Sequence, residues 1–279
     1  MSKLNQINNK IIVDALREDI PTNDITTQLT ISNKEKIRAQ IISKERGILC
    51  GLDIVKKVFL TVDASLKIKT KLKDGNIIRN NQCILELYGK KSSILTAERT
   101  ALNFLGLATG VATKTNYLSK KIKPFKSKVC CTRKTIPNLR SLQKYAVIIG
   151  GGTNNRMNLS EEIFIKDNHL ANSKNIALLL QSVIDKNKSK KIITVEVDTL
   201  AQLKMIRHLK INRVLFDNMK ASEIKKGIKL LPNKIETEAS GNIDEKNIIS
   251  YAKTGVKRIS MGSLTHTLSN FDFSLEINK

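Results

Sequence analysis

Residues 192–218 read IITVEVDTLAQLKMIRHLKINRVLFDN. Two short apolar runs, Ile192–Val197 and Val214–Phe216, flank an amphipathic stretch, which predicts a strand, a helix and a second strand. Each of the two runs ends in or beside a carboxylate, Glu196 in the first and Asp217 in the second. The stretch is therefore typical of the repeating unit of a parallel sheet.

The same alternation extends in both directions from this stretch. Six or seven such units predict a closed or nearly closed β/α barrel. No Gly-x-Gly-x-x-Gly motif opens the first unit, which argues against a dinucleotide-binding Rossmann fold. Further strands are expected at Val129–Cys131, Ile163–Ile165, Ile235–Ala239 and Arg258–Met261, and helices at about 139–147, 172–185, 199–208, 221–230 and 244–253.

The chain has a different texture before about residue 90. Alternating apolar positions and a helix at about 52–60 predict a strand-rich α/β sandwich unit. A long helical pattern follows from Ser92 to Leu118, with breaks expected near Gly106 and Gly110. The apolar positions that carry this interpretation are Ile7, Ile11 and Leu16 in a short helix, and Ile37, Ala39, Ile41, Leu66, Ile68 and the run Cys83–Leu87 in strands.

Polar residues follow each expected strand of the barrel. In a β/α barrel the carboxyl ends of the strands meet at one mouth, where active sites lie. One polar strand end is ordinary, but six in series predict a site with a cationic side, an acidic side and a phosphate cradle. The six are Thr132-Arg133-Lys134, Lys166-Asp167-Asn168, Glu196 with Asp198, Asp217-Asn218, Ser240-Gly241-Asn242 and Gly262-Ser263.

The cationic side is the most informative of the three. Arginine binds carboxylate and phosphate groups through two parallel hydrogen bonds, a geometry that lysine cannot reproduce. The ligand predicted by this cluster carries more than one carboxylate or phosphate. The basic residues concerned are Arg99, Arg133, Lys134, Arg140, Arg156 and Lys166.

The acidic side and the glycine-containing turns complete the expected mouth. Glu196 and Asp217 are suited to balance the cations or to hold Mg²⁺ on a diphosphate. The turns at 240–242 and 262–263 offer backbone N–H groups to a phosphate. The run 150–152, which is Gly-Gly-Gly, is expected to form a flexible loop that brings Asn154, Asn155 and Arg156 to the mouth.

Composition narrows the class of partner. The chain of 279 residues has 49 basic and 25 acidic side chains, a net charge of +24, and 41% hydrophobic residues. This apolar fraction excludes a disordered chain, and no apolar run is long enough to span a membrane. The basic residues are mostly scattered lysines and aromatics are only 4%, which disfavours nucleic-acid binding and favours a small polyanionic substrate.

Two further features concern the compartment. The N-terminal residues show no apolar segment of a signal peptide. The four cysteines, Cys50, Cys83, Cys130 and Cys131, form no CxxC pair and have no histidine at ligand spacing. We therefore expect a protein of the reducing cytoplasm without a cysteine-based metal site.

At this point the chain is recognisable from its motifs. From end to end it resembles quinolinate phosphoribosyltransferase, the carboxylating nicotinate-nucleotide pyrophosphorylase. The motifs are short, but in this order they are specific. They are EDIPTNDITT at 18–27, AERTALNFL at 97–105, TRKTIPNLR at 132–140, KYAVIIGGG at 144–152, IKDNH at 165–169, VEVD at 195–198, FDNM at 216–219, EASGN at 238–242 and MGSLTH at 261–266.

The resemblance implies a fold and an assembly. We expect an N-terminal α/β sandwich domain at 1–110, an incomplete parallel β/α barrel at 111–269, and a tail at 270–279 that packs back on the first domain. A homodimer or a dimer-based hexamer is implied, with no nucleic-acid or membrane partner.

The resemblance also implies a reaction. Phosphoribose would pass from phosphoribosyl pyrophosphate to quinolinate with loss of CO₂, giving nicotinate mononucleotide and diphosphate for NAD biosynthesis, with Mg²⁺ as cofactor. The pyridine nitrogen displaces diphosphate from ribose C1, and the cationic ring then loses its 2-carboxylate. Such a reaction needs orientation and charge placement more than a strong base.

Each side of the mouth receives a role from the resemblance. Lys134, Glu196 and Asp217 would be catalytic. The dicarboxylate and the nearby phosphate would be bound by Thr132, Arg133, Lys134, Asn155, Arg156 and Lys166, with Arg99 from the neighbouring subunit. The ribose and the Mg-diphosphate would be contacted by Glu196 and Asp217, and the 5-phosphate would lie among Ser240, Gly241, Asn242, Gly262, Ser263 and His266.

The chain departs from the family at one position of this set. The family usually has Asn-His-Arg where this chain has Asn154-Asn155-Arg156. An amide donates hydrogen bonds but cannot become cationic. A related phosphoribosyltransferase of molybdenum-transport operons, acting on another acceptor, is therefore one alternative. A barrel aldolase that uses Lys166 as a Schiff-base nucleophile is another.

Overall fold

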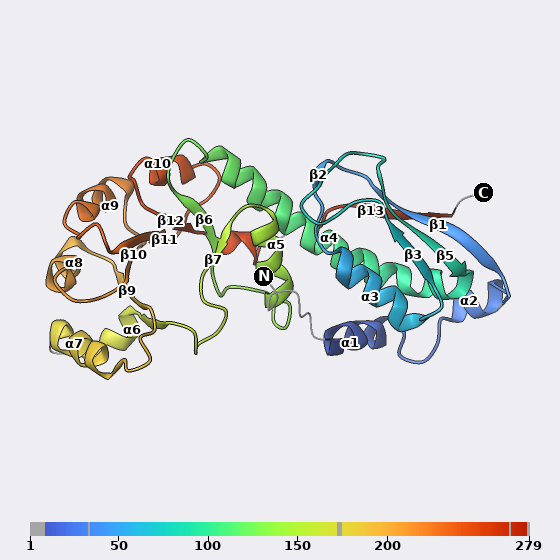
Figure 1. Ribbon diagram of the computed structural model, residues 1–279, viewed down its shortest axis with the longest axis horizontal. Helices are drawn as coiled ribbons and strands as arrows, with labels where there is room; N and C mark the ends of the chain where they lie inside the picture. Colours follow the sequence, from blue (N-terminus) through green and yellow to red (C-terminus); the bar gives the residue numbers. More distant parts are fainter. Residues whose placement is uncertain (1–8, 33, 172–174, 268, 278–279) are drawn as a thin grey trace. The chain divides into compact units, whose positions relative to one another are not determined.

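The computed structural model describes residues 9–32, 34–171, 175–267 and 269–277 (Figure 1). The chain divides into two compact units, which interleave along the sequence. The first unit comprises 1–116, 135–151 and 264–279, and the second comprises 117–134 and 152–263. Residues 135–151, which the sequence assigns to the barrel domain, belong to the first unit.

The first unit is built on a four-stranded antiparallel sheet in the order β13-β1-β5-β3. Ala39 and Ile41 of β1 are fully buried, as the period of two in the sequence predicts. The C-terminal residues form β13, which pairs with β1. The strands are β1 (Lys36–Ser43), β3 (Lys67–Thr70), β5 (Cys83–Lys90) and β13 (Phe273–Ile277), beside the small ladder of β2 (Gly47–Ile48) and β4 (Ile77–Ile78).

Helices complete the first unit. Helix α3 buries Val55, Val58 and Phe59, so that its apolar stripe adds to the core of the unit. The helices with residues in this unit are α1 (Asn9–Asp19), α2 (Ile25–Thr30), α3 (Leu52–Val62), α4 (Lys91–Lys121) and α5 (Arg140–Ile149). Ile7, expected in the first helix, lies outside the described residues.

Helix α4 runs for 31 residues without the breaks expected at Gly106 and Gly110. The two glycines serve close packing instead. A Cβ on Gly106 would stand 2.7 Å from the carbonyl oxygen of Phe271, and one on Gly110 would overlap the carbonyl oxygen of Ser269. The N–H of Phe271 also donates to the carbonyl of Gly106 at 3.1 Å. The glycines therefore let the segment before β13 lie directly against the helix.

The second unit is a single sheet of seven parallel strands in the order β7-β6-β12-β11-β10-β9-β8. Strands β7 and β8 are its two edges, so the barrel is incomplete, as expected. The strands are β6 (Lys128–Cys131), β7 (Thr153–Asn154), β8 (Ile163–Ile165), β9 (Ile193–Val197), β10 (Arg213–Asp217), β11 (Glu236–Ser240) and β12 (Arg258–Ser260).

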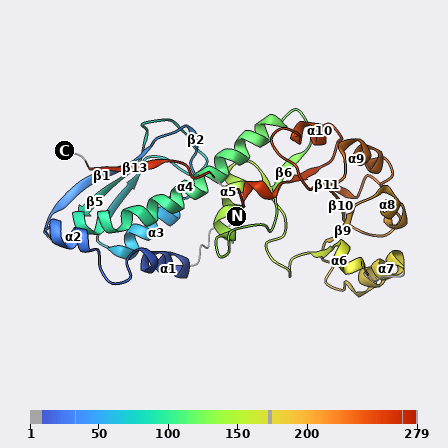
Figure 2. The same cartoon turned by 180° about the vertical axis from the view of Figure 1, so that it is seen from behind.

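The helices of the second unit follow the strands in turn and lie on the outer side of the curved sheet (Figures 1 and 2). They are α6 (Asp167–Leu170), α7 (Ile176–Lys186), α8 (Leu200–Ile206), α9 (Ala221–Ile228) and α10 (Ile248–Ala252), with a 3₁₀ turn η1 at Gly262–Leu264. Residues 172–174, where a helix is expected to start, lie outside the described residues. No helix within the described ranges has the length and apolar character needed to cross a membrane.

The glycine run at 150–152 forms the turn between α5 and β7, where the loop is expected, and one of its glycines also serves close packing. A Cβ on Gly150 would stand 2.6 Å from Cβ of Thr115 in α4, so this glycine allows close packing against that helix. The residues directly after the run, Thr153 and Asn154, form β7 and pair with β6. Asn155 and Arg156 therefore follow directly after a short strand into which this turn leads.

The packing of α4 against the segment before β13 makes a stability prediction. In an exposed helix, Gly→Ala stabilises by about 1 kcal/mol. We expect Gly106→Ala to lower the free energy of unfolding instead, by about 1–3 kcal/mol, because the methyl group must displace the backbone of Phe271. Urea unfolding measures the difference. Asn103→Ala, at an exposed position of the same helix, is the control and should not destabilise; equal stability of Gly106→Ala and wild type would contradict the packing account.

Candidate active site

Parallel pairing aligns the strand ends of the second unit. Asp217, the last residue of β10, pairs in register with Ser240, the last residue of β11. Glu196 lies one residue before the end of β9, in register with Leu215. The acidic side and one turn of the expected phosphate cradle thus come from three adjacent strands, at the same edge of one sheet.

The carboxylates at this edge lie in a partly desolvated environment. Burial raises the pKa of Glu196 to about 7, and the negative charge of Asp217 contributes. Burial also raises the pKa of Asp217, with a further contribution from Asp198. Lys166 opposes both shifts, and Lys134 opposes that of Asp217. The cations and carboxylates predicted from separate motifs therefore form one electrostatic cluster.

The cationic side is organised around an aromatic ring that the sequence analysis did not single out. The guanidinium of Arg156 lies 4.9 Å from the ring centroid of Phe164, and Nζ of Lys166 lies 5.7 Å from it. Both distances are typical of cation–π contacts. Burial, and then the like charge of Arg133, lower the pKa of Arg156, so Arg133 belongs to the same group. On either side of Arg133 in the chain, Oγ1 of Thr132 accepts a hydrogen bond from the N–H of Lys134 at 3.0 Å.

The turn after β11 has the backbone conformation that glycine favours. Gly241 has φ +93° and Asn242 has φ 50°. A Cβ on Gly241 would stand 2.6 Å from Cγ of Asn218, so no larger residue fits there. Asn218 links the turn to the acidic side, because its side chain accepts from Asn242 and donates to Asp217 at 3.1 and 2.7 Å. The second expected turn begins at Gly262, at the start of η1.

Three predicted site residues belong to the first unit. Arg140 is the first residue of α5, and its Nε donates to Oγ1 of Thr135 at 3.0 Å. Arg99 is exposed on α4, beside Glu98. His266 is exposed after η1, with its Nδ1 2.8 Å from Oγ1 of Thr267. All the other predicted site residues belong to the second unit.

Sequence reasoning missed a charged network in the barrel interior. Glu238 is fully buried, and its Oε2 lies 3.4 Å from Nε of Arg258 and 3.7 Å from Nε of Arg213. Arg213 also pairs with Glu236 at 2.7 Å and with Glu162 at 3.2 Å. The signal was present, because Glu236 and Glu238 are two residues apart on β11 and so face the same side.

Asn155, expected at the acceptor, makes its side-chain contacts with this network. Its Nδ2 donates to Oε1 of Glu238 at 2.7 Å and to Oγ of Ser260 at 2.9 Å. Its Oδ1 accepts from Arg258 at 2.7 Å. The amide at this position is therefore engaged by buried residues of β11 and β12.

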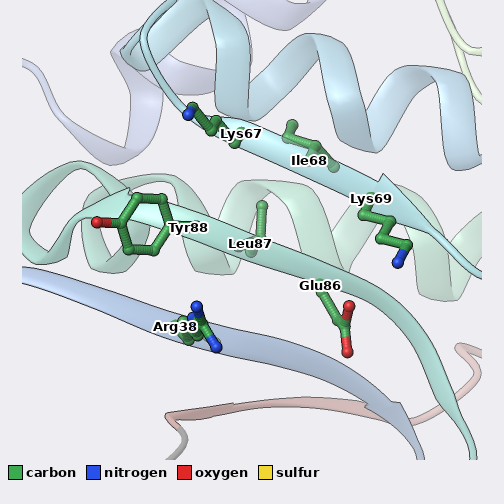
Figure 3. A pocket seen from close by; sticks show the side chains of 8 residues that line it. Arg38, Lys67, Ile68, Lys69, Glu86, Leu87 and Tyr88 are labelled. Carbon is green, nitrogen blue, oxygen red and sulfur yellow. The ribbon is translucent and has the colours of Figure 1, made fainter.

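A pocket elsewhere in the molecule carries none of the predicted site residues. It lies over β1, β3 and β5 in the first unit, where Tyr88 stands between Arg38 and Lys67 (Figure 3). Glu86 in the same pocket pairs with Lys71 at 2.8 Å. These contacts follow from cross-strand neighbours on a polar sheet face.

The comparisons with known proteins agree with the motifs. Residues 24–109 match the family described as quinolinate phosphoribosyl transferase, N-terminal domain, and residues 111–276 match its C-terminal domain. The chain therefore belongs to the quinolinate phosphoribosyltransferase family, which confirms the resemblance. The fold class expected from the sequence is confirmed as well.

Individual relatives cover nearly the whole chain. A probable nicotinate-nucleotide pyrophosphorylase [carboxylating] of Methanocaldococcus jannaschii is 38% identical, over 96% of both chains. One of Bacillus subtilis is 35% identical, over 96% of this chain and 92% of the relative. The solved nicotinate-nucleotide pyrophosphorylase from Francisella tularensis is 38% identical and superposes with a TM-score of 0.93 over 99% of both chains.

The charge cluster makes a prediction about Glu196. Its carboxyl should titrate near pH 7, and it should titrate higher in Lys166→Met, because the positive charge of Lys166 lowers this pKa. In Asp217→Asn the pKa should fall, because a neighbouring negative charge is removed. Carboxyl ¹³C NMR on glutamate-labelled protein measures the shifts, with Glu196→Gln assigning the signal. A wild-type value near 4.5 would contradict the desolvated site.

Proposed function

We propose that this protein transfers phosphoribose from phosphoribosyl pyrophosphate to quinolinate with decarboxylation, giving nicotinate mononucleotide, diphosphate and CO₂ for NAD biosynthesis. It is then a decarboxylating pentosyltransferase. Family membership supports the activity. The observation that carries the proposal is the register of β9, β10 and β11, which brings Glu196, Asp217 and Ser240 to one edge of the sheet. Lys166 lies close enough to lower the pKa of both carboxyls, so the acceptor and the ribose can meet at a boundary between cations and carboxylates.

The acceptor belongs on the cationic side in this proposal. Arg133, Arg156 and Lys166 supply three positive charges for the two adjacent carboxylates of quinolinate and a nearby phosphate. Arg156 is oriented by the ring of Phe164 and by its hydrogen bond to the carbonyl of Glu162. A guanidinium held in this way can bind a carboxylate without further loss of side-chain freedom.

The ribose belongs beside the carboxylates. As the pyridine nitrogen attacks C1 and the bond to diphosphate breaks, positive charge develops on the ribose, and Glu196 and Asp217 would stabilise it. Lys134, close enough to lower the pKa of Asp217, would balance the charge of that carboxylate. The turns at 240–242 and 262–263 would bind the 5-phosphate through backbone N–H groups and the Ser240 and Ser263 hydroxyls, with His266 nearby. The ring then loses its 2-carboxylate as CO₂, and C2 takes up a proton.

Magnesium is proposed as the cofactor. No group of three or more metal-ligating side chains lies together within the described ranges. Glu196 and Asp217 nevertheless fit the usual magnesium site, which combines one or two carboxylates with substrate phosphates. Bound there, Mg²⁺ would offset the charge of the departing diphosphate.

The aldolase alternative receives less support from the site. Lys166 is exposed, and it lies near enough to Glu196 and Asp217 to lower both of their pKa values. Amines that form Schiff bases commonly work from a desolvated pocket or beside another cation. Lys166 has a cation nearby, since Arg156 lies over the same ring of Phe164, but it does not lie in a desolvated pocket. The alternative with a different acceptor depends on Asn155, whose side chain contacts Glu238, Ser260 and Arg258.

A dimer or a dimer-based hexamer is proposed as the working form, with Arg99 reaching the neighbour's mouth. The exposure of Arg99 on α4 is compatible with this role. The cytoplasm remains our expected location, since the four cysteines form no disulfide.

Substrate choice tests the activity directly. Quinolinate should be used roughly 10²-fold better than nicotinate in kcat/KM, because nicotinate leaves the charges that bind the 2-carboxylate unpaired. Product formation with each acid, phosphoribosyl pyrophosphate and Mg²⁺ provides the comparison. Equal use of the two acids would contradict the proposal.

Metal dependence separates the two sides of the site. Calorimetry in EDTA should give the same quinolinate dissociation constant as in Mg²⁺, because Arg and Lys side chains meet the acceptor carboxylates. Phosphoribosyl pyrophosphate should bind more weakly when the metal is removed. Loss of quinolinate binding in EDTA would refute the assignment of the cationic side.

Subunit exchange tests the role of Arg99. Arg99→Ala and Arg133→Ala should each be inactive alone, whereas a mixture that exchanges subunits should recover about a quarter of wild-type activity. A random mixture has half heterodimers, and each of these holds one intact site of two. If Arg99 serves its own subunit, every site keeps one lesion, and the mixture stays inactive although mass spectrometry shows exchange.

A further inference from the structure

Asn155 occupies a position from which its amide makes three contacts with buried side chains. It donates to Glu238 and Ser260 and accepts from Arg258, at 2.7, 2.9 and 2.7 Å. A neutral imidazole has one donor and one acceptor, whereas an amide has two donors and an acceptor. The donors and the acceptor of the Asn155 side chain therefore match those of the interior residues it contacts.

The carboxylate of Glu238 needs a hydrogen-bond donor such as the amide of Asn155. Glu238 is fully buried, and its Oε1 accepts from both Asn155 and Ser260, the latter at 2.5 Å. A buried carboxylate is costly unless its charge is balanced and its oxygens are hydrogen-bonded. Oε2 of Glu238 has no hydrogen-bond partner among the described residues, so the hydrogen bonds from Asn155 and Ser260 to Oε1 are the ones that this carboxylate receives there. Arg258 balances part of the charge, with its Nε 3.4 Å from Oε2 of Glu238, and donates from its other end to Asn155.

The same network reaches Arg156 from two directions. Arg156 follows Asn155 directly in the chain, so the hydrogen bonds of Asn155 fix the backbone from which Arg156 extends. The guanidinium of Arg156 donates to the carbonyl of Glu162 at 3.2 Å. The carboxylate of Glu162 in turn pairs with Arg213, which is 5% exposed and also meets Glu238.

We infer that Asn155 is a positioning residue, which anchors the end of β7 to the buried Glu238–Ser260–Arg258 cluster and thereby orients Arg156 toward the acceptor. The inference rests on the proposed function in assigning Arg156 to the acceptor, and it revises the role of Asn155 from substrate contact to support. An uncharged amide suits this position because it donates to Glu238 and Ser260 and accepts from Arg258.

The test compares four variants that differ in what they break. Asn155→Leu removes all three hydrogen bonds at similar volume, and Asn155→His retains one donor and one acceptor. Ser260→Ala removes a hydroxyl that is 3% exposed, and so breaks the cluster without changing Asn155. Asn158→Ala, at an exposed position of the loop after β7, is the matched control.

The kinetic constants separate support from direct contact. In Asn155→Leu the KM for quinolinate should rise about tenfold or more, with kcat and the KM for phosphoribosyl pyrophosphate within about twofold of wild type. Ser260→Ala should raise the quinolinate KM about threefold or more. In Asn155→His the quinolinate KM should stay within about threefold of the wild-type value. A quinolinate KM that rises in Asn155→Leu and is unchanged in Ser260→Ala would overturn the inference, as would equal losses in all constants.

A second readout needs no substrate and distinguishes this inference from the proposed function. Phenylglyoxal labels accessible arginines, and mass spectrometry measures the rate at Arg156. We expect labelling of Arg156 about fivefold faster in Asn155→Leu and Ser260→Ala, and unchanged in Asn158→Ala. If the wild-type protein does not use quinolinate, the proposed activity is wrong. The labelling rate of Arg156 still tests the positioning role of Asn155 in that case. Equal labelling of wild type, Asn155→Leu and Ser260→Ala would overturn the positioning role.

Discussion

Parallel pairing of seven strands is the constraint on which the site depends, because it brings the carboxyl ends of all the strands to one edge of a single sheet. Residues far apart in the chain become neighbours there. Lys166 follows β8, Glu196 lies near the end of β9 and Asp217 ends β10, yet Lys166 lowers the pKa of both carboxyls. An acceptor with two carboxylates and a donor that develops positive charge need such a paired arrangement.

Below this edge the barrel interior is polar rather than filled by apolar layers. Glu238, Arg258 and Arg213 are buried together, and breaking one partner of such a cluster leaves an uncompensated charge in the interior. Replacing one of these three charged residues alone should therefore destabilise the fold. The cluster meets the mouth at Asn155, whose hydrogen bonds link the buried charges to the backbone that carries Arg156.

Much of the barrel could be predicted because its strands are short apolar runs with polar ends, as at Ile163–Ile165 and Arg213–Asp217. Other features depend on contacts between segments distant in sequence. The low helix propensity of glycine predicted a break at Gly106, but α4 is continuous there and the backbone of Phe271 packs against this glycine. The partners of Asn155 come from β11 and β12, about a hundred residues away in the chain. The family motif implied a contact of this residue with the acceptor, whereas its side chain contacts Glu238 and Ser260.

The central claim is that one site both transfers phosphoribose and removes the 2-carboxylate of the acceptor. Quinolinate carrying ¹⁴C in its 2-carboxylate tests this most directly, with released CO₂ and nicotinate mononucleotide measured in the same reaction. The account predicts one CO₂ for each mononucleotide, and no CO₂ when phosphoribosyl pyrophosphate is left out, because only the ribosylated ring is cationic. Mononucleotide formed without CO₂, or CO₂ released without phosphoribosyl pyrophosphate, would contradict it.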